Sequence, residues 1–257
     1  MITPAHPLTL AFERTGHGRP LVLIHGITEN HTSFGSVIGA LAEHFDVLAV
    51  DLRGHGDSPN VAPYDLETMA ADVAHTVGHV WPDGPAPVVV GHSLGGAVAT
   101  AYAARYPTAG VVNVDQSMDL AGFQEMVRGA EPMLRSDACE QVMVGLFEGM
   151  YGALPPEEAD RLRALRDVRP ESVLGVWGML FDLDRAELAA EVDRVMTNPA
   201  PSPYLAIHGQ DPGPAYPQWL QQRIPGAEVE VWADLGHYPH LVRPDEFVAT
   251  VVTLAEV

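Results

Sequence analysis

The stretch that decides the fold is PAPVVVGHSLGGAVATAYAARY, residues 85–106. It begins with a short, continuous apolar run, which is typical of a strand buried on both faces of a parallel sheet. It ends with an alanine-rich segment that stops at Pro107, as expected of a helix. Between the two stands Gly-His-Ser-Leu-Gly, residues 91–95, which predicts a tight turn from strand to helix.

A turn of this kind would expose the side chain of its serine. The serine adopts a strained backbone conformation, and Gly91 and Gly95 must be small because adjacent backbone presses on them. The hydroxyl of Ser93 then stands above the sheet, near the amino end of the following helix, whose dipole favours developing negative charge. Ser93 is therefore the candidate nucleophile.

Short apolar runs alternate with helical patterns along the rest of the chain. Strands are predicted over residues 20–26, 45–51, 85–91, 110–115, 203–209 and 228–232, and helices over 36–44, 66–80, 94–106 and 245–254. This alternation favours an α/β fold, with a mostly parallel central sheet flanked by helices.

Between Gln116 and Ala200 the strand signal fades and helical patterns dominate. We therefore predict a core formed by residues 1–115 and 201–257, with residues 116–200 as a helical cap or lid over the carboxyl edge of the sheet. Seven of the nine methionines lie in this segment, where methionine suits either gap-filling core or an adaptable apolar pocket.

Composition narrows the classes of partner. The net charge is −20 and all fourteen basic residues are arginine, so neither nucleic acid nor an anionic membrane is expected as a partner. The absence of lysine excludes Schiff-base chemistry and a Walker-type phosphate loop. A small-molecule substrate is the expected partner, and a homodimer is compatible with this composition.

The single cysteine and the amino-terminal residues bear on location. Cys139 leaves no partner for an internal disulfide, and its helical-looking segment does not favour it as a nucleophile. No apolar stretch approaches the roughly 18 residues that a membrane span needs, and the first residues lack the layout of a secretory signal. We expect a cytoplasmic protein.

Three motifs together resemble the α/β-hydrolase superfamily, over residues 21–257. They are GHSLGG after PVVV, the His-Gly pair at 25–26 after LVLI, and DLRGHGDS at 51–58 after FDVLAV. The resemblance implies a serine nucleophile, a histidine base and an acidic residue, which form a catalytic triad without a cofactor.

The histidine implied by the resemblance lies after the last strand. His237 follows Gly236 in a loop, and we predict it as the general base because a loop can bring an imidazole to Ser93. The alternative, His240, stands at the start of the next turn and is expected to pack or to cap.

The acid that should orient the histidine has two candidates. Asp211, after the predicted strand 203–209, is preferred because it gives the order Ser, Asp, His. It stands only two residues after Gly209, whereas three is the common spacing in the family. The alternative acid is Asp115, at the end of the predicted strand 110–115.

An acyl-transfer serine also needs donors for an oxyanion. The resemblance implies the main-chain N–H of Leu94 and a second N–H from the loop after LVLIHG, with Ile27 preferred and Thr28 as the alternate. No H-E-x-x-H motif and no cysteine pair is present, so no metal is expected.

The expected function is hydrolysis of a carboxylic ester or lactone, or a thioester, through an acyl-enzyme. The alternatives are C–C bond hydrolysis, hydroxynitrile cleavage or peroxyacid formation by the same triad, or a non-catalytic ligand receptor on the same scaffold. Apolar side chains in the predicted cap favour a small apolar or aromatic substrate. They are Phe123, Met126, Met133, Met143, Phe147, Met150, Tyr151, Trp177, Met179 and Phe181.

Overall fold

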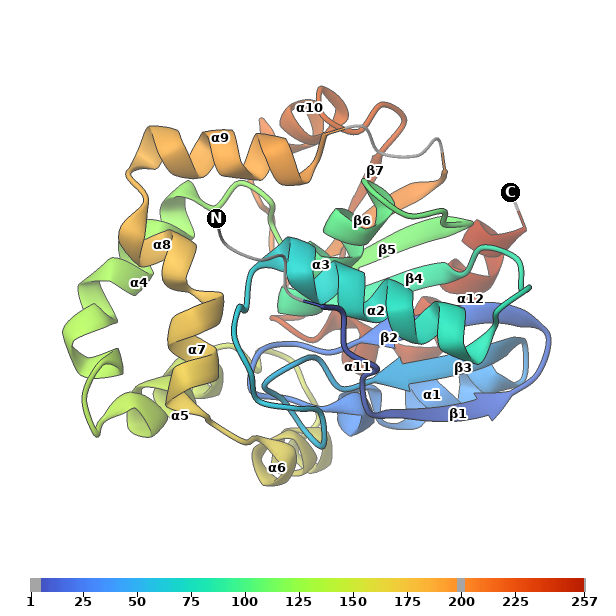
Figure 1. Ribbon diagram of the computed structural model, residues 1–257, viewed down its shortest axis with the longest axis horizontal. Coiled ribbons are helices and arrows are strands. Elements are labelled where there is room, and N and C mark those ends of the chain that lie inside the picture. The colour runs from blue at the N-terminus through green and yellow to red at the C-terminus, as the bar shows by residue number, and fades with distance from the viewer. Residues whose placement is uncertain (1–5, 198–201, 257) are drawn as a thin grey trace.

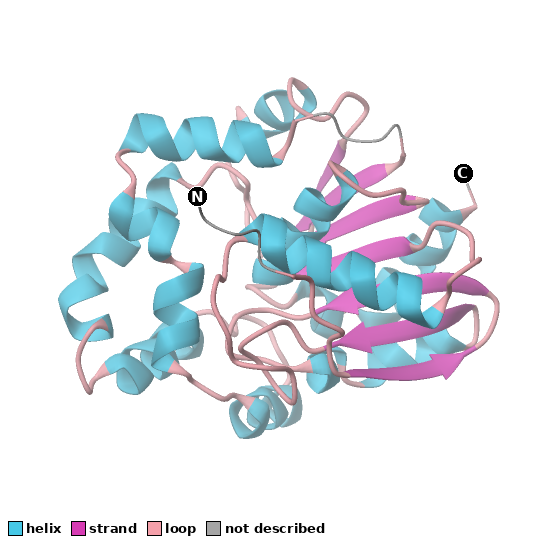
Figure 2. Ribbon diagram, viewed as in Figure 1, coloured by secondary structure: helices cyan, strands magenta, loops and turns pink. Residues whose placement is uncertain are grey.

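A seven-stranded sheet forms the centre of the computed structural model, which describes residues 6–197 and 202–256 (Figures 1 and 2). The spatial order is β1-β3-β2-β4-β5-β6-β7, and every neighbouring pair is parallel except β1 and β3. The strands are β1 (Phe12–Gly16), β2 (Arg19–Ile24), β3 (Phe45–Val50), β4 (Val88–His92), β5 (Gly110–Val114), β6 (Tyr204–His208) and β7 (Glu228–Val231). The predicted mostly parallel α/β sheet is confirmed.

The inner strands are buried along their whole length, which explains their continuous apolar runs. Strand β1 was not predicted from the sequence. Its residues FERTG are largely exposed and lack an apolar run, and they pair antiparallel with β3 at the edge of the sheet. This strand is stabilised by main-chain pairing more than by burial.

Helices cover both faces of the sheet and create two apolar clusters. Helices α2 (Leu66–Val80) and α3 (Leu94–Ala103) pack on one face, together with α10 (Tyr216–Gln221). Helices α1 (Ser36–Ala42) and α12 (Pro244–Ala255) pack on the other. Alternate residues of β4 enter the two clusters, Val89 on the first face and Val88 and Val90 on the second, as the strand period of two requires.

In the described part of the chain, six helices lie between β5 and β6, and we call them the insertion helices. They are α4 (Ala121–Leu134), α5 (Cys139–Glu148), α6 (Pro156–Leu165), α7 (Pro170–Val176), α8 (Gly178–Asp182) and α9 (Arg185–Val195). Figure 1 shows them beyond the carboxyl ends of the parallel strands. Ligands of open α/β sheets bind at this end of the strands.

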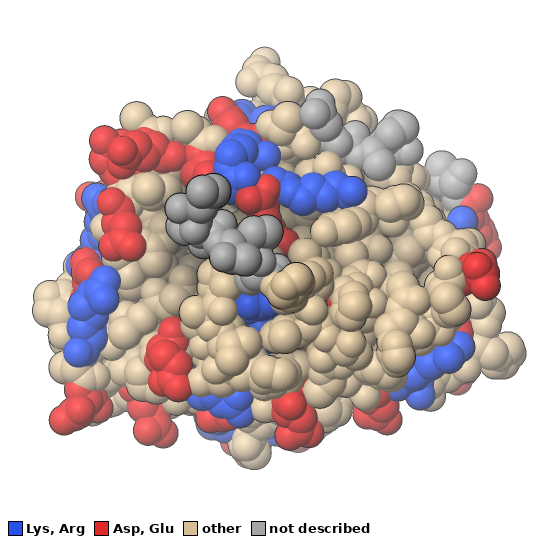
Figure 3. Space-filling view, viewed as in Figure 1, with Lys and Arg blue, Asp and Glu red and all other residues tan. Residues whose placement is uncertain are grey.

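Acidic and basic side chains are intermixed on the visible surface over the insertion helices, whereas the surface over α2 and α3 is mostly uncharged (Figure 3). Where these two surfaces meet, Glu67 at the start of α2 pairs both with Arg105 and with Arg194 of α9. No helix among the described residues combines the length and apolar character that a membrane crossing needs.

Candidate active site

The turn between β4 and α3 has the geometry that the sequence predicts. Ser93 has φ 53° and ψ −123°, in a region that L-residues rarely adopt, and its N–H donates to the carbonyl of Val114 at 2.9 Å. A Cβ on Gly91 would lie 2.0 Å from the carbonyl oxygen of Gly95. One on Gly95 would lie 2.1 Å from that of Ile24. Only glycine fits at either position.

Replacing Gly95 by alanine is expected to destabilise the protein by about 3 kcal/mol, because the new methyl meets rigid backbone. Denaturant unfolding would measure this change. The matched control is Gly78→Ala in α2, where a Cβ would meet nothing within 4 Å. That variant should be stabilised by about 0.5–1 kcal/mol. Equal stability of the two variants would contradict the packing argument.

His237 and Asp115 meet at the carboxyl edge of the sheet. The Nδ1–H of His237 donates to Oδ2 of Asp115 at 2.6 Å, and the N–H of Gly209 donates to Oδ1 of the same carboxylate at 2.7 Å. Asp115 directly follows β5 and has φ 53°, a conformation that turns its side chain toward the His237 loop. Its own N–H is bound by the carbonyl of Ile207 at 2.7 Å.

The structure places Asp115, and not Asp211, against His237. Asp211 is exposed, and its Oδ1 accepts a hydrogen bond from the N–H of Gly213 at 2.8 Å. The preferred assignment of Asp211 as the partner of His237 is therefore corrected to Asp115. The physical reason is that Asp115 already binds Gly209, which directly follows β6, whereas Asp211 lies beyond it and binds within its own turn.

The Asp115 carboxylate is stabilised in its ionised form. Burial alone raises its pKa. The hydrogen bond and charge of His237 and the N–H of Gly209 lower the pKa by more than burial raises it, so it lies below the ordinary value. Asp115 thus stays negative at neutral pH, which fixes the proton of His237 on Nδ1 and leaves Nε2 to accept a proton.

His240, the alternative histidine, lies elsewhere in the packing. It belongs to the short helix α11 (Pro239–Val242) and is fully buried among the rings of Phe34, His92 and Phe247. Its burial lowers its pKa well below the ordinary value. It packs, as expected, and does not line the cavity beside Ser93.

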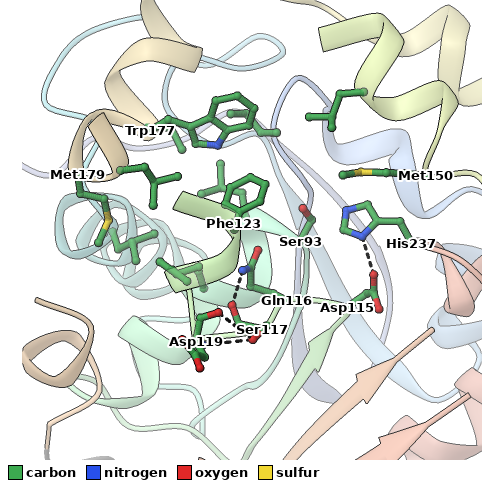
Figure 4. Close-up of a pocket in the computed structure, with 18 of the residues that line it drawn as sticks. Ser93, Asp115, Gln116, Ser117, Asp119, Phe123, Met150, Trp177, Met179 and His237 are labelled. Atoms are coloured by element: carbon green, nitrogen blue, oxygen red, sulfur yellow. Dashed lines mark hydrogen bonds and ion pairs between the residues drawn. The ribbon is translucent and has the colours of Figure 1, made fainter. Parts of the chain in front are cut away.

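A cavity of about 210 Å³ contains Ser93 and His237, which lie beside each other in Figure 4. The other lining residues are Ile27, Leu66, Leu94, Ala97, Asp115, Gln116, Ser117, Asp119, Leu120, Phe123, Leu146, Phe147, Met150, Val176, Trp177, Met179 and Leu180. Most are apolar, and many come from the insertion helices. The cavity is thus an apolar space with polar groups concentrated at the strand ends.

The sequence predicted part of this lining. Of the apolar residues predicted in the cap, Phe123, Phe147, Met150, Trp177 and Met179 line the cavity. Others face elsewhere: Met126 and Met133 are exposed, whereas Met143, Tyr151 and Phe181 are buried outside the lining. Gln116, Ser117 and Asp119 were missed, although their place directly after a predicted strand is a signal that could have found them.

The main-chain N–H groups predicted for an oxyanion are both at the cavity. Ile27 and Leu94 line it, and neither N–H has an acceptor within residues 6–197 and 202–256. Leu94 is the first residue of α3, where N–H groups have no partner inside the helix. Thr28, the alternate, does not line the cavity.

Within the described part of the chain, no three histidine, cysteine or acidic side chains are arranged to hold a metal ion.

The chain matches the model of the alpha/beta hydrolase family over residues 21–250, and it belongs to that family. The pimeloyl-[acyl-carrier protein] methyl ester esterase of Chromobacterium violaceum is 31% identical over 261 residues, which cover 94% of this chain and 96% of the relative. The corresponding esterase of Nitrosospira multiformis is 29% identical over 273 residues, covering 96% and 98%. A thermophilic esterase structure from Thermogutta terrifontis has a TM-score of 0.73 at 25% identity, covering 96% of this chain and 93% of that one.

Proposed function

We propose that this chain is a serine hydrolase that cleaves carboxylic esters or lactones of small apolar or aromatic substrates. The observation that carries the proposal is the shared cavity of Ser93 and His237, with the imidazole bound to Asp115 at 2.6 Å. The esterase names of the relatives support the ester-hydrolase class.

In the proposed mechanism, Ser93 Oγ attacks the substrate carbonyl carbon while Nε2 of His237 accepts the hydroxyl proton. The negative charge that develops on the carbonyl oxygen is stabilised by the N–H groups of Ile27 and Leu94. His237 then donates the proton to the leaving alcohol, and Asp115 stabilises the imidazolium throughout. Water repeats the sequence on the acyl-enzyme and releases the acid.

The cavity lining supports a neutral acyl group. Asp115 and Asp119 line it, and no arginine does so among the described residues. A carboxylate on the acyl chain would therefore enter a cavity without a positive partner, which is costly. Apolar side chains from the insertion helices favour aliphatic or aromatic acyl groups.

The test is labelling of the wild-type protein with a fluorophosphonate, followed by peptide mapping, beside turnover of a panel of nitrophenyl esters and lactones. We expect one label, on Ser93, and faster turnover of neutral than of carboxylated acyl groups. Heat-denatured protein is the control. A native protein that takes no label at Ser93 would refute the proposal.

Phe123→Ala is expected to raise KM for a short aromatic ester about tenfold, because the half-buried ring lines the cavity and meets Trp177 edge to face at 5.6 Å. For esters with longer acyl chains KM should rise less, since the widened cavity admits these chains. The matched control is Met126→Ala on the same helix, where the side chain is 48% exposed and outside the cavity. Steady-state kinetics would show the difference, and an equal rise in both variants would contradict this assignment of the wall.

A further inference from the structure

A buried charged cluster joins the insertion helices to the sheet beside the site. Arg166 directly follows α6, and its side chain is 4% exposed, while that of Glu29, in the loop after β2, is 1% exposed. Nη2 of Arg166 lies 3.7 Å from Oε1 of Glu29. We call Glu29, His92, Arg166 and Tyr238 the buried charged cluster.

The first contact of Arg166 is with the loop that carries the N–H of Ile27. Its Nη1 donates to Oγ1 of Thr28 at 2.7 Å, and the N–H of Asp167 donates to the carbonyl of Thr28 at 2.9 Å. Thr28 has φ 64°, which is strained for a β-branched residue and persists only where surrounding contacts hold it. Glu29 closes the loop by accepting the N–H of Gly26 at 3.1 Å.

The second contact of Arg166 is with the loop that carries His237. Its Nη2 donates to the hydroxyl of Tyr238 at 3.0 Å, and that hydroxyl donates to Oε1 of Glu29 at 2.8 Å. Tyr238 directly follows His237. One guanidinium therefore binds the neighbours of Ile27 and of His237 at once, as a planar fork with several donors can.

His92, the residue directly before Ser93, brings the nucleophile turn into contact with the same cluster. Its Nε2 donates to the carbonyl of His237 at 2.8 Å, because a carbonyl can only accept, and its Nδ1 faces Oε2 of Glu29 at 3.5 Å. Burial raises the pKa of Glu29, but His92, Arg166 and Tyr238 together lower it by a larger amount, so the carboxyl stays ionised. The buried negative charge requires the guanidinium beside it.

Arg166 also supports the cavity wall. Its guanidinium lies 3.5 Å from the ring centre of Phe147, which lines the cavity. The same side chain therefore touches the wall, the Ile27 loop and the His237 loop.

We propose that Arg166 is a positioning residue that holds the Ile27 loop and the His237 loop in place relative to Ser93. The site is then assembled when α6 packs against the core. The kinetic part of this inference rests on the proposed function. The structural part does not, because it concerns two loops whose main chain can be observed directly.

The test compares Arg166→Met with Arg163→Met. Arg163 lies on α6, which Arg166 directly follows; it is 43% exposed, binds Glu148 and Asp160, and touches neither loop. For Arg166→Met we expect kcat to fall about 100-fold, as for a misplacement of about 1 Å, with KM within threefold. Free guanidinium chloride at millimolar concentration should restore at least about a tenth of the lost rate, whereas sodium chloride of equal ionic strength should not. Arg163→Met should keep the wild-type kcat.

Amide hydrogen exchange, followed by mass spectrometry, gives a readout that does not depend on turnover. In Arg166→Met, residues 26–30 and 236–239 should exchange at least about tenfold faster, with the strands unchanged, and guanidinium should reverse the effect. Unchanged exchange in both loops would overturn the proposal, and so would a lost kcat that guanidinium fails to restore. A wild type without ester turnover would refute the proposed function alone, since the exchange experiment would still decide the role of Arg166.

Discussion

Replacing Ser93 by alanine is expected to lower kcat for a nitrophenyl ester by about 10⁴-fold or more. The variant keeps the N–H groups of Ile27 and Leu94 and the apolar wall, so substrate binding should persist with KM within threefold. In the proposed mechanism, it loses the oxygen that forms the acyl-enzyme, and His237 then has only water to activate. Stopped assays at high enzyme concentration would measure the residual rate.

Two controls separate chemistry from folding. The free energy of unfolding of Ser93→Ala should lie within about 0.5 kcal/mol of the wild-type value, because the change removes one oxygen at the cavity and leaves the backbone hydrogen bond to Val114 in place. Ser117→Ala removes a second hydroxyl from the same cavity and should keep kcat within threefold. A Ser93→Ala variant with more than 1% of the wild-type rate would contradict the acyl-enzyme mechanism.

The turn around Ser93 could be predicted from the sequence because its constraints are local. The strand, the two glycines and the helix are consecutive, and each residue type is required by its immediate neighbours. The strands β2 to β6 could be predicted for a similar reason, since burial on both faces leaves a continuous apolar run. Strand β1 and helix α10 carry no such run, and pairing or packing with distant residues determines them.

The partner of His237 could not be chosen on the same grounds. Asp115 and Asp211 both follow strands that end at one edge of the sheet, so order and spacing leave both available. The choice depends on where the His237 loop passes relative to β5 and β6, which is a tertiary property. In the structure it passes over Asp115, with the His237 N–H bound to the carbonyl of Met150 in the insertion at 2.9 Å.

The buried charged cluster could not be predicted from the sequence at all. Thr28 and Arg166 are 138 residues apart, and neither lies in a recognisable motif. The sequence indicates an arginine in a helical, polar segment, for which a solvated position is the ordinary expectation. Only the packing of α6 against the core brings that guanidinium to Thr28 and Tyr238.

Asp115→Asn and Asp211→Asn provide the second large effect, because the two substitutions are chemically identical and only one touches His237. Asp115→Asn should lower kcat by about 10⁴-fold at neutral pH. The amide N–H₂ of asparagine would donate to Nδ1 of His237, so the ring proton would move to Nε2, which then could not accept the proton of Ser93. The charge that stabilises the imidazolium would also be lost.

Asp211→Asn should keep kcat within twofold, because Asp211 is exposed and an asparagine oxygen can accept the same N–H of Gly213. The pH dependence gives an independent check. Since the pKa of Asp115 is lowered in the folded protein, its carboxylate is present at neutral pH and is lost only as the pH falls through that lowered value. Asp115 should therefore stay ionised down to about pH 5, and its protonation should not reduce wild-type activity at that pH. Equal losses in the two variants, or a larger loss in Asp211→Asn, would show that the imidazole takes a different partner during turnover.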